Sequence, residues 1–187
     1  EDKADFLQAD LLAHPGTAAA MAEPYVFMEG VSIPPKPESA MPDALIAADT
    51  SFVFGGERIR VMPTVAHTAG DISVYFTESR VAHLGDAFLA SNPMMYPGTL
   101  EPDVFLDRLD AFLDAMHPET VVVGGHEEVT DLEAVRAQIR VTRDAMAFVR
   151  ASIDGGRAIE ETARVGQDRF PPQWTAFFYQ LFTQPGA

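Results

Sequence analysis

Three short stretches decide how this chain folds: His67-Thr68-Ala69-Gly70-Asp71, Leu84-Gly85-Asp86 and Val121-Val122-Val123-Gly124-Gly125-His126. Each one includes or directly follows an apolar, β-rich run of the kind that favours a strand. Residues just beyond strand ends lie at the rim of a sheet, where side chains from separate strands can meet. His67, Asp86 and His126 would offer imidazole nitrogen and carboxylate oxygen there, which are ligands for zinc and iron. The sequence therefore predicts a metal site made of these three residues.

The composition narrows the classes of function. The chain has 187 residues, with 13 Lys and Arg against 28 Asp and Glu, so its formal charge is −15. A field of this sign repels phosphate backbones and anionic lipid surfaces, which predicts no nucleic-acid and no membrane partner. The chain has no cysteine, which excludes disulfides, thiolate ligands and a cysteine nucleophile. We therefore expect a small-molecule substrate, and bacterial periplasmic and cytoplasmic locations both fit.

Alternating and β-branched patterns predict most of the strands in the first two thirds of the chain. The expected strands are 9–13, 52–54, 59–62, 72–76, 80–84 and 120–123. The second and third of these flank Gly55-Gly56, a strong signal for a hairpin. A short helix is expected over 17–21, because that stretch is rich in alanine. The proline-rich segment 31–42 is expected to be an extended surface crossover.

Apolar residues at helical spacing predict helices over 102–116, 131–153 and 173–182. The second of these follows Thr130-Asp131-Leu132-Glu133, which fits a capping box. Hairpins first, with helices after and between them, indicate an α+β protein with helices packed on the outside of its sheets. The length suits one domain over 1–187, with a helical tail from about residue 131.

The order His67, Asp86, His126, with a predicted strand before each, resembles the C-terminal half of the metallo-β-lactamase superfamily. The resemblance covers about residues 9–132 and implies the αββα sandwich of that superfamily. The family's other signature, His-x-His-x-Asp-His, occurs nowhere in this sequence. The N-terminal part of the fold is therefore expected to be missing from this chain. Three explanations compete: the upstream segment is cut away or unresolved, a partner chain supplies it, or the site has been lost.

The resemblance also implies roles for the three residues. His67 would complete a first zinc site, His126 a second, and Asp86 would bridge them, so one or two zinc ions are expected. The implied activity is that of a hydrolase whose zinc-bound hydroxide attacks an ester, amide, lactone, thioester or phosphoester. This chain alone is expected to be inactive without the upstream motif. The alternatives are an iron site of the sulfur dioxygenase type, without His126 as a ligand, and a non-catalytic binding module with a decayed metal site.

Other side chains have less specific interpretations. Met94, Met95 and Tyr96 follow Asp86, and they either line an apolar substrate pocket or cover the core. Asp71 either orients His67 or caps the next strand.

The remaining histidines, His14, His83 and His117, are expected to be structural, with His117 as a charge partner of a helix C-terminus. The aromatic residues of the tail are expected to pack on the sandwich, with a homodimer contact as the alternative. They are Phe170, Trp174, Phe177, Phe178, Tyr179 and Phe182.

Overall fold

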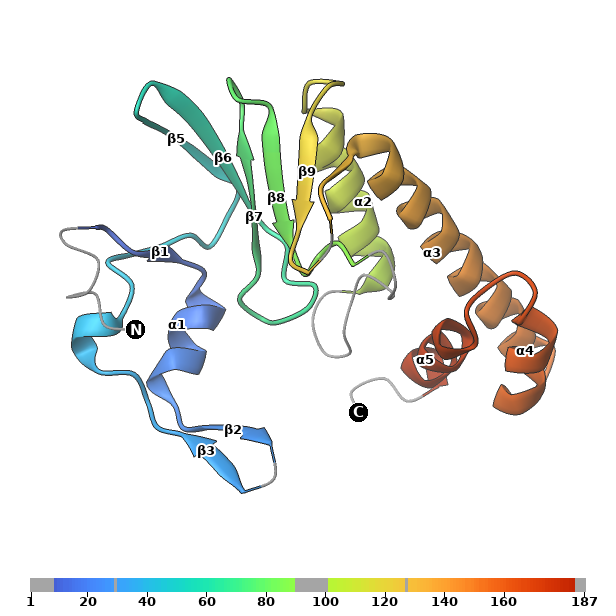
Figure 1. Ribbon diagram of the computed structural model, residues 1–187. Helices are drawn as coiled ribbons and strands as arrows, with labels where there is room; N and C mark the ends of the chain where they lie inside the picture. Colours follow the sequence, from blue (N-terminus) through green and yellow to red (C-terminus); the bar gives the residue numbers. More distant parts are fainter. Residues whose placement is uncertain (1–8, 29, 90–100, 127, 184–187) are drawn as a thin grey trace.

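The computed structural model describes residues 9–28, 30–89, 101–126 and 128–183. Its centre is a six-stranded sheet in the order β10-β9-β8-β7-β6-β5 (Figure 1). The strands are β5 (Thr50–Phe54), β6 (Glu57–Pro63), β7 (Ile72–Phe76), β8 (Val81–Gly85), β9 (Val121–Gly124) and β10 (Thr130–Asp131). Neighbouring strands are antiparallel except β8 and β9, which run parallel. The strands expected between 52 and 123 are thus confirmed, with small differences at their ends.

Two helices cover one face of this sheet. α2 (Pro102–Asp114) lies between β8 and β9 in the chain, as a parallel pair requires, and α3 (Leu132–Asp154) follows β10. The apolar stripes of both helices pack against the sheet in the main core. Its most buried members from the sheet and the two helices are Ala82, Leu84, Val122, Phe105, Leu106, Leu109, Leu113, Val135, Ile139, Met146 and Val149.

The opposite face of the sheet carries a second, smaller apolar cluster. Ile59 and Val61 of β6 are buried there together with Ile46, and Leu12 packs against them. Leu12 lies in β1 (Leu12–Ala13), which pairs in parallel with β4 (Ala44–Leu45). Helices on one face and this β1–β4 region on the other confirm the expected α+β class.

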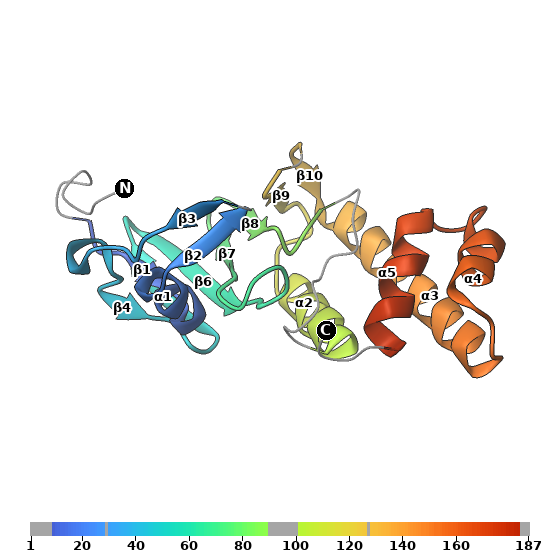
Figure 2. The same ribbon diagram turned by 90° about the horizontal axis from the view of Figure 1, so that it is seen from below.

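The chain between β1 and β4 forms a small unit at the end of the sheet. α1 (Pro15–Ala22) is followed by an antiparallel hairpin of β2 (Tyr25–Met28) and β3 (Val31–Ile33). Figure 1 shows α1 between this hairpin and the end of the sheet, and Figure 2 shows the hairpin from below. The expectation of an irregular crossover over 31–42 was therefore wrong in part: β3 begins the segment and ends at the first proline, and Glu38–Ala40 form a 3₁₀ turn.

The helical tail packs around the far part of α3. α4 (Ile159–Gly166) and α5 (Pro172–Thr183) contact each other and α3. Phe170, Trp174 and Phe178 are buried, and the remaining tail aromatics are partly buried against the same core. The expected packing of the aromatic tail is confirmed, although its partner is α3 rather than the sheet. Within the described ranges, no helix has the length and apolar character to cross a bilayer.

Three local expectations need correction. The strand expected over 9–13 is only Leu12–Ala13 within the described residues, because it pairs only with the two-residue strand β4, Ala44–Leu45. α3 is capped by Asp131 rather than Thr130: the Asp131 carboxylate accepts a hydrogen bond of 2.9 Å from the backbone N–H of Ala134. α4 was not expected as a separate helix, because its buried positions are Thr162 and Gly166 instead of an apolar stripe.

Candidate metal centre

Strand direction brings three loops to the same end of the sheet. β6, β8 and β9 all run toward that end, as their registers show: Pro63 pairs with Ile72, and Gly85 with Gly124. The loop after β6, the residue after β8 and the turn after β9 therefore meet at one edge. These positions hold His67, Asp86 and His126.

The three side chains contact one another through the carboxylate. His67 Nε2 lies 3.4 Å from Asp86 Oδ2, and His126 Nε2 lies 3.5 Å from Asp86 Oδ1. The side chains of His67 and Asp86 are 29% and 23% exposed, whereas that of His126 is 76% exposed. Asp86 thus lies between two imidazoles, each facing a different carboxylate oxygen, and the cluster is open to solvent on the His126 side.

Gly125 makes this close approach possible. A Cβ atom at this position would lie 1.7 Å from Asp86 Oδ1 and 2.9 Å from Asp86 Cγ. The backbone N–H of Gly125 also donates a hydrogen bond of 2.9 Å to the carbonyl of Gly85, which ties the turn after β9 to the end of β8. The sequence indicated a permissive turn here, but its steric reason lies in the Asp86 carboxylate.

Asp71 shapes the loop that presents His67. Its Oδ2 accepts hydrogen bonds from the backbone N–H groups of His67 and Thr68, at 2.6 and 2.7 Å, and the Thr68 hydroxyl donates to its Oδ1. The Asp71 carbonyl accepts from the N–H of Thr64 at 3.0 Å. The loop also contains Val65 at φ 49°, a strained conformation for a β-branched residue. Asp71 therefore orients the backbone at His67, the first of the two roles expected for it.

A family comparison decides what kind of protein this is. The model of the metallo-beta-lactamase superfamily matches residues 7–178, nearly the whole chain and all three of these loops. The chain belongs to the metallo-beta-lactamase superfamily. The resemblance seen in the sequence is thereby confirmed at the level of family and fold.

Individual members of the superfamily are only distantly similar. The hydroxyacylglutathione hydrolase of Acidiphilium cryptum is 34% identical over 85 residues, which cover 46% of this chain and 34% of that protein. The chain thus spans about a third of the length of this relative. The metallo-beta-lactamase family protein TTHA1429 of Thermus thermophilus is 20% identical with a TM-score of 0.60, covering 96% of this chain and 68% of the other. TTHA1623, solved in a di-iron-bound form, is 19% identical with a TM-score of 0.52, covering 72% and 65%. The two structures show a shared fold.

The donor set of this superfamily member is partial. Among the residues that the structure describes, no group of three or more His, Asp or Glu side chains is arranged to hold a metal ion. His67, Asp86 and His126 have the chemistry of zinc or iron ligands, and the first two are partly shielded from solvent. The metal roles of the three residues thus remain a prediction.

The other candidate residues lie outside this cluster. The ring of His14 caps α1, since its Nδ1 accepts from the N–H of Gly16 at 3.1 Å. His83 is exposed on the sheet face opposite α2 and α3. His117 was expected to pair with the C-terminus of α2, but among the described contacts its ring bonds to the turn before β9 instead: its Nδ1 accepts from the N–H of Glu119 at 3.2 Å. Met94, Met95 and Tyr96 lie outside the described residues.

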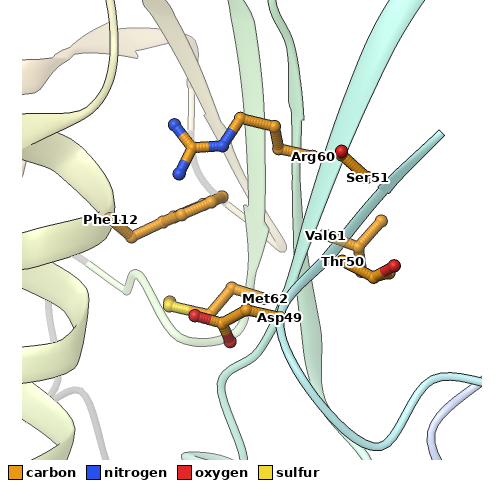
Figure 3. A pocket seen from close by; sticks show the side chains of 7 residues that line it. All are labelled: Asp49, Thr50, Ser51, Arg60, Val61, Met62 and Phe112. Carbon is orange, nitrogen blue, oxygen red and sulfur yellow. The ribbon is translucent and has the colours of Figure 1, made fainter. Parts of the chain in front are cut away.

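A polar cavity of about 300 Å³ lies at the β5 edge of the sheet, between β5, β6 and α2 (Figure 3). Arg60 crosses it, with its guanidinium 5.7 Å from the centre of the Phe112 ring and a hydrogen bond of 3.2 Å to the carbonyl of Ala115. Asp49 on its wall is paired with Arg108 at 3.0 Å. Its charged groups are thus engaged within the protein, and none of the three predicted metal ligands lines it.

Proposed function

We propose that this protein is a metal-dependent hydrolase in which His67, Asp86 and His126 hold one or two zinc ions. The observation that carries the proposal is the spacing of the three donor groups. Charge-assisted N–H···O bonds are about 2.7–2.9 Å long. The two imidazole–carboxylate separations of 3.4 and 3.5 Å exceed that range. Two ligands of one tetrahedral zinc ion, with bonds of about 2.0–2.2 Å, lie about 3.3–3.6 Å apart.

The two carboxylate oxygens support two metal positions. Oδ2 faces His67 and Oδ1 faces His126, so each oxygen has its own imidazole. A carboxylate arranged in this way fits the bridging role that the family resemblance implies for Asp86. Further ligands are needed to complete either ion, because the three residues provide only two donor atoms to each.

The residues around the cluster have supporting roles in this proposal. Gly125 leaves the space that the Asp86 carboxylate occupies, and Asp71 holds the main chain at His67 and Thr68. The exposed side of the cluster, at His126, gives a substrate a route of approach. A bound zinc ion lowers the pKa of water to about 7, which provides a nucleophile at neutral pH.

The bond that is cleaved is proposed from the relatives. The relatives from Acidiphilium cryptum and Brucella anthropi are hydroxyacylglutathione hydrolases, and their name describes cleavage of an acyl group from glutathione. This favours a thioester, followed by an ester, lactone, amide or phosphoester, as the substrate bond. Iron is the alternative metal, since a structural relative was solved with two iron ions.

The proposal is tested by metal content and hydrolysis on the same samples. Zinc and iron are measured by mass spectrometry of the purified protein, and a panel of thioesters, esters and lactones is assayed for turnover. In the metal-competent full-length protein, His67→Ala, Asp86→Ala and His126→Ala should each lower bound metal and abolish or sharply reduce turnover. His117→Ala is the matched control, because its ring bonds only to the turn at Glu119 among the contacts described.

Unchanged turnover in Asp86→Ala would refute the proposed mechanism. A protein that binds no metal, and whose three variants behave like the parent, would support the non-catalytic interpretation instead. Stoichiometric iron without zinc, together with a His126→Ala variant that keeps its metal, would replace zinc by the iron site.

A further inference from the structure

A second cavity, of about 480 Å³, lies against the loop that follows His67, although none of the three predicted metal ligands lines it. Its walls come from α1, from the β2–β3 hairpin with the chain that follows it, and from the loop after His67. Most of its lining is apolar or backbone, and the side chains that argue for a ligand are Ala20, Met21, Tyr25, Ile33 and Pro34. Ligand pockets of proteins are typically about 300–1,000 Å³ and mostly apolar, and this cavity is in that range.

The cavity begins one residue after His67. Thr68, Ala69 and Gly70 form one of its walls. α1 is fixed against this wall without intervening side chains: a Cβ atom on Gly16 would lie 2.0 Å from the Ala69 carbonyl oxygen, and one on Gly70 would lie 2.2 Å from Thr17 Oγ1. Thr17 Oγ1 donates a hydrogen bond of 2.9 Å to the Gly70 carbonyl. α1 and the loop after His67 are therefore packed directly against each other at this wall of the cavity.

The hairpin leaves apolar side chains unburied beside this cavity. Tyr25 is 56% exposed and Ile33 is 36% exposed, and both line it. The backbone N–H of Lys36 donates a hydrogen bond of 2.8 Å to the Met21 carbonyl, which fixes the chain after β3 to the end of α1. Exposed apolar side chains on a fixed backbone can be buried by an apolar ligand, which is favourable.

Two opposite charges lie on the same cavity lining. Lys36 is the only lysine in the described part of the chain, and no ion pair or hydrogen bond of its ammonium group is found there. Glu23 is the acidic group of the lining, and it does not pair with Lys36 within 4.0 Å. The two charges of the lining are opposite in sign, so its apolar side chains, rather than a net charge, carry the argument for an aliphatic ligand.

We propose that this cavity binds the aliphatic acyl group of the substrate, so that medium-chain acyl compounds are the substrate class. This inference rests on the proposed function, because it names what the neighbouring metal site would act on. The acyl chain lies among the apolar side chains of α1 and the hairpin, with its reacting end at the loop after His67.

The test measures binding without turnover. Hexanoate, octanoate, decanoate and octanol are titrated into the metal-loaded protein by calorimetry. Affinity should rise about fourfold for each added methylene until the cavity is filled. Octanol has no carboxylate and should occupy the same cavity, so its affinity should also fall in Ala20→Phe.

A matched pair of variants locates the binding site. Ala20→Phe places a ring in the cavity and should weaken octanoate binding by about tenfold or more, since the ring takes the space of at least two methylenes. Ala19→Phe changes the residue just before it in α1. Ala19 is exposed and does not line the cavity, so this variant should bind octanoate like the parent. Metal content and hydrolysis of an acetyl thioester should be the same in both variants.

These readouts separate the two claims. Octanoate binding that is equal in Ala20→Phe, Ala19→Phe and the parent would overturn the acyl pocket, whatever the metal assays give. Affinity that does not depend on chain length would overturn it as well. If the alanine variants of His67, Asp86 and His126 all keep their metal and their turnover, the proposed function is refuted. Calorimetry would still show whether octanoate binds in the cavity.

Discussion

Gly125→Ala tests how closely Asp86 must approach the turn after β9. The added Cβ would lie 1.7 Å from Asp86 Oδ1, and real Cβ contacts are essentially never closer than 3.0 Å. The oxygen must therefore retreat by about 1.3 Å even to reach that limit, against a tolerance of about 0.2 Å in metal–ligand distances. Gly125 is not among the glycines with positive φ, so alanine fits its backbone and the effect is steric.

The expected result is a selective loss of metal. Affinity for zinc should fall by at least about 10–100-fold, the range found when groups that orient metal ligands are changed. The free energy of unfolding should fall by about 1–3 kcal/mol, as for other overpacked sites. Zinc affinity is measured by competition with a chromophoric chelator, and stability by urea titration.

Gly155→Ala is the control for a glycine substitution as such. Its Cβ would lie 3.3 Å from the nearest atom, at the end of α3, where φ is −79°. This variant should keep the zinc affinity of the parent. If Gly125→Ala also keeps that affinity, the Asp86 carboxylate does not contribute to metal binding from its position against this turn. Its proposed role as a metal ligand would then be refuted.

Three other predictions concern separate parts of the molecule. Asp71→Ala removes the acceptor for the N–H groups of His67 and Thr68, so zinc affinity should fall about 10–100-fold with the fold retained by circular dichroism; an unchanged affinity would show that the loop keeps its shape without this carboxylate. Trp174→Ala empties a site that is 1% exposed, and urea titration should show a loss of about 3–5 kcal/mol with bound metal unchanged; a loss below about 1 kcal/mol would contradict the described packing. Hydrogen bonds from the Ser79 hydroxyl and N–H lower the pKa of Glu57. The ionised carboxylate therefore stabilises the fold above the unfolded pKa of about 4.3. This stabilisation is lost as the pH falls through the lower folded pKa. Ser79→Ala should therefore raise the pKa of Glu57 in a carbon-13 NMR titration, and an unmoved pKa would argue against these bonds.

The sequence predicted the elements whose pattern is repeated and long. The hairpin around Gly55-Gly56, the next strand pair and helices α2 and α3 all follow from alternation or helical spacing of apolar residues. The meeting of His67, Asp86 and His126 was also expected, because each follows a strand. Its structural cause is the parallel pairing of β8 with β9, which puts Gly85 beside Gly124.

The features that were missed depend on tertiary contacts. α4 has no apolar stripe, since Gly166 is buried against the rings and methyl groups of neighbouring helices. Tyr25 and Val26 of β2 and all of β3 are exposed, so alternation between buried and exposed residues does not mark this hairpin. The need for glycine at 125 comes from a carboxylate far away in the sequence. Local patterns carry no record of such contacts.

The most direct test of the central claim is anomalous X-ray diffraction from crystals of the zinc-loaded protein, recorded at the zinc and iron edges. We predict a zinc peak within about 2.0–2.2 Å of His67 Nε2 and an Asp86 oxygen. Any second peak should lie at His126 and the other oxygen of Asp86. The metal site would be refuted by a zinc peak elsewhere, or by no peak together with direct contact between His67 and Asp86.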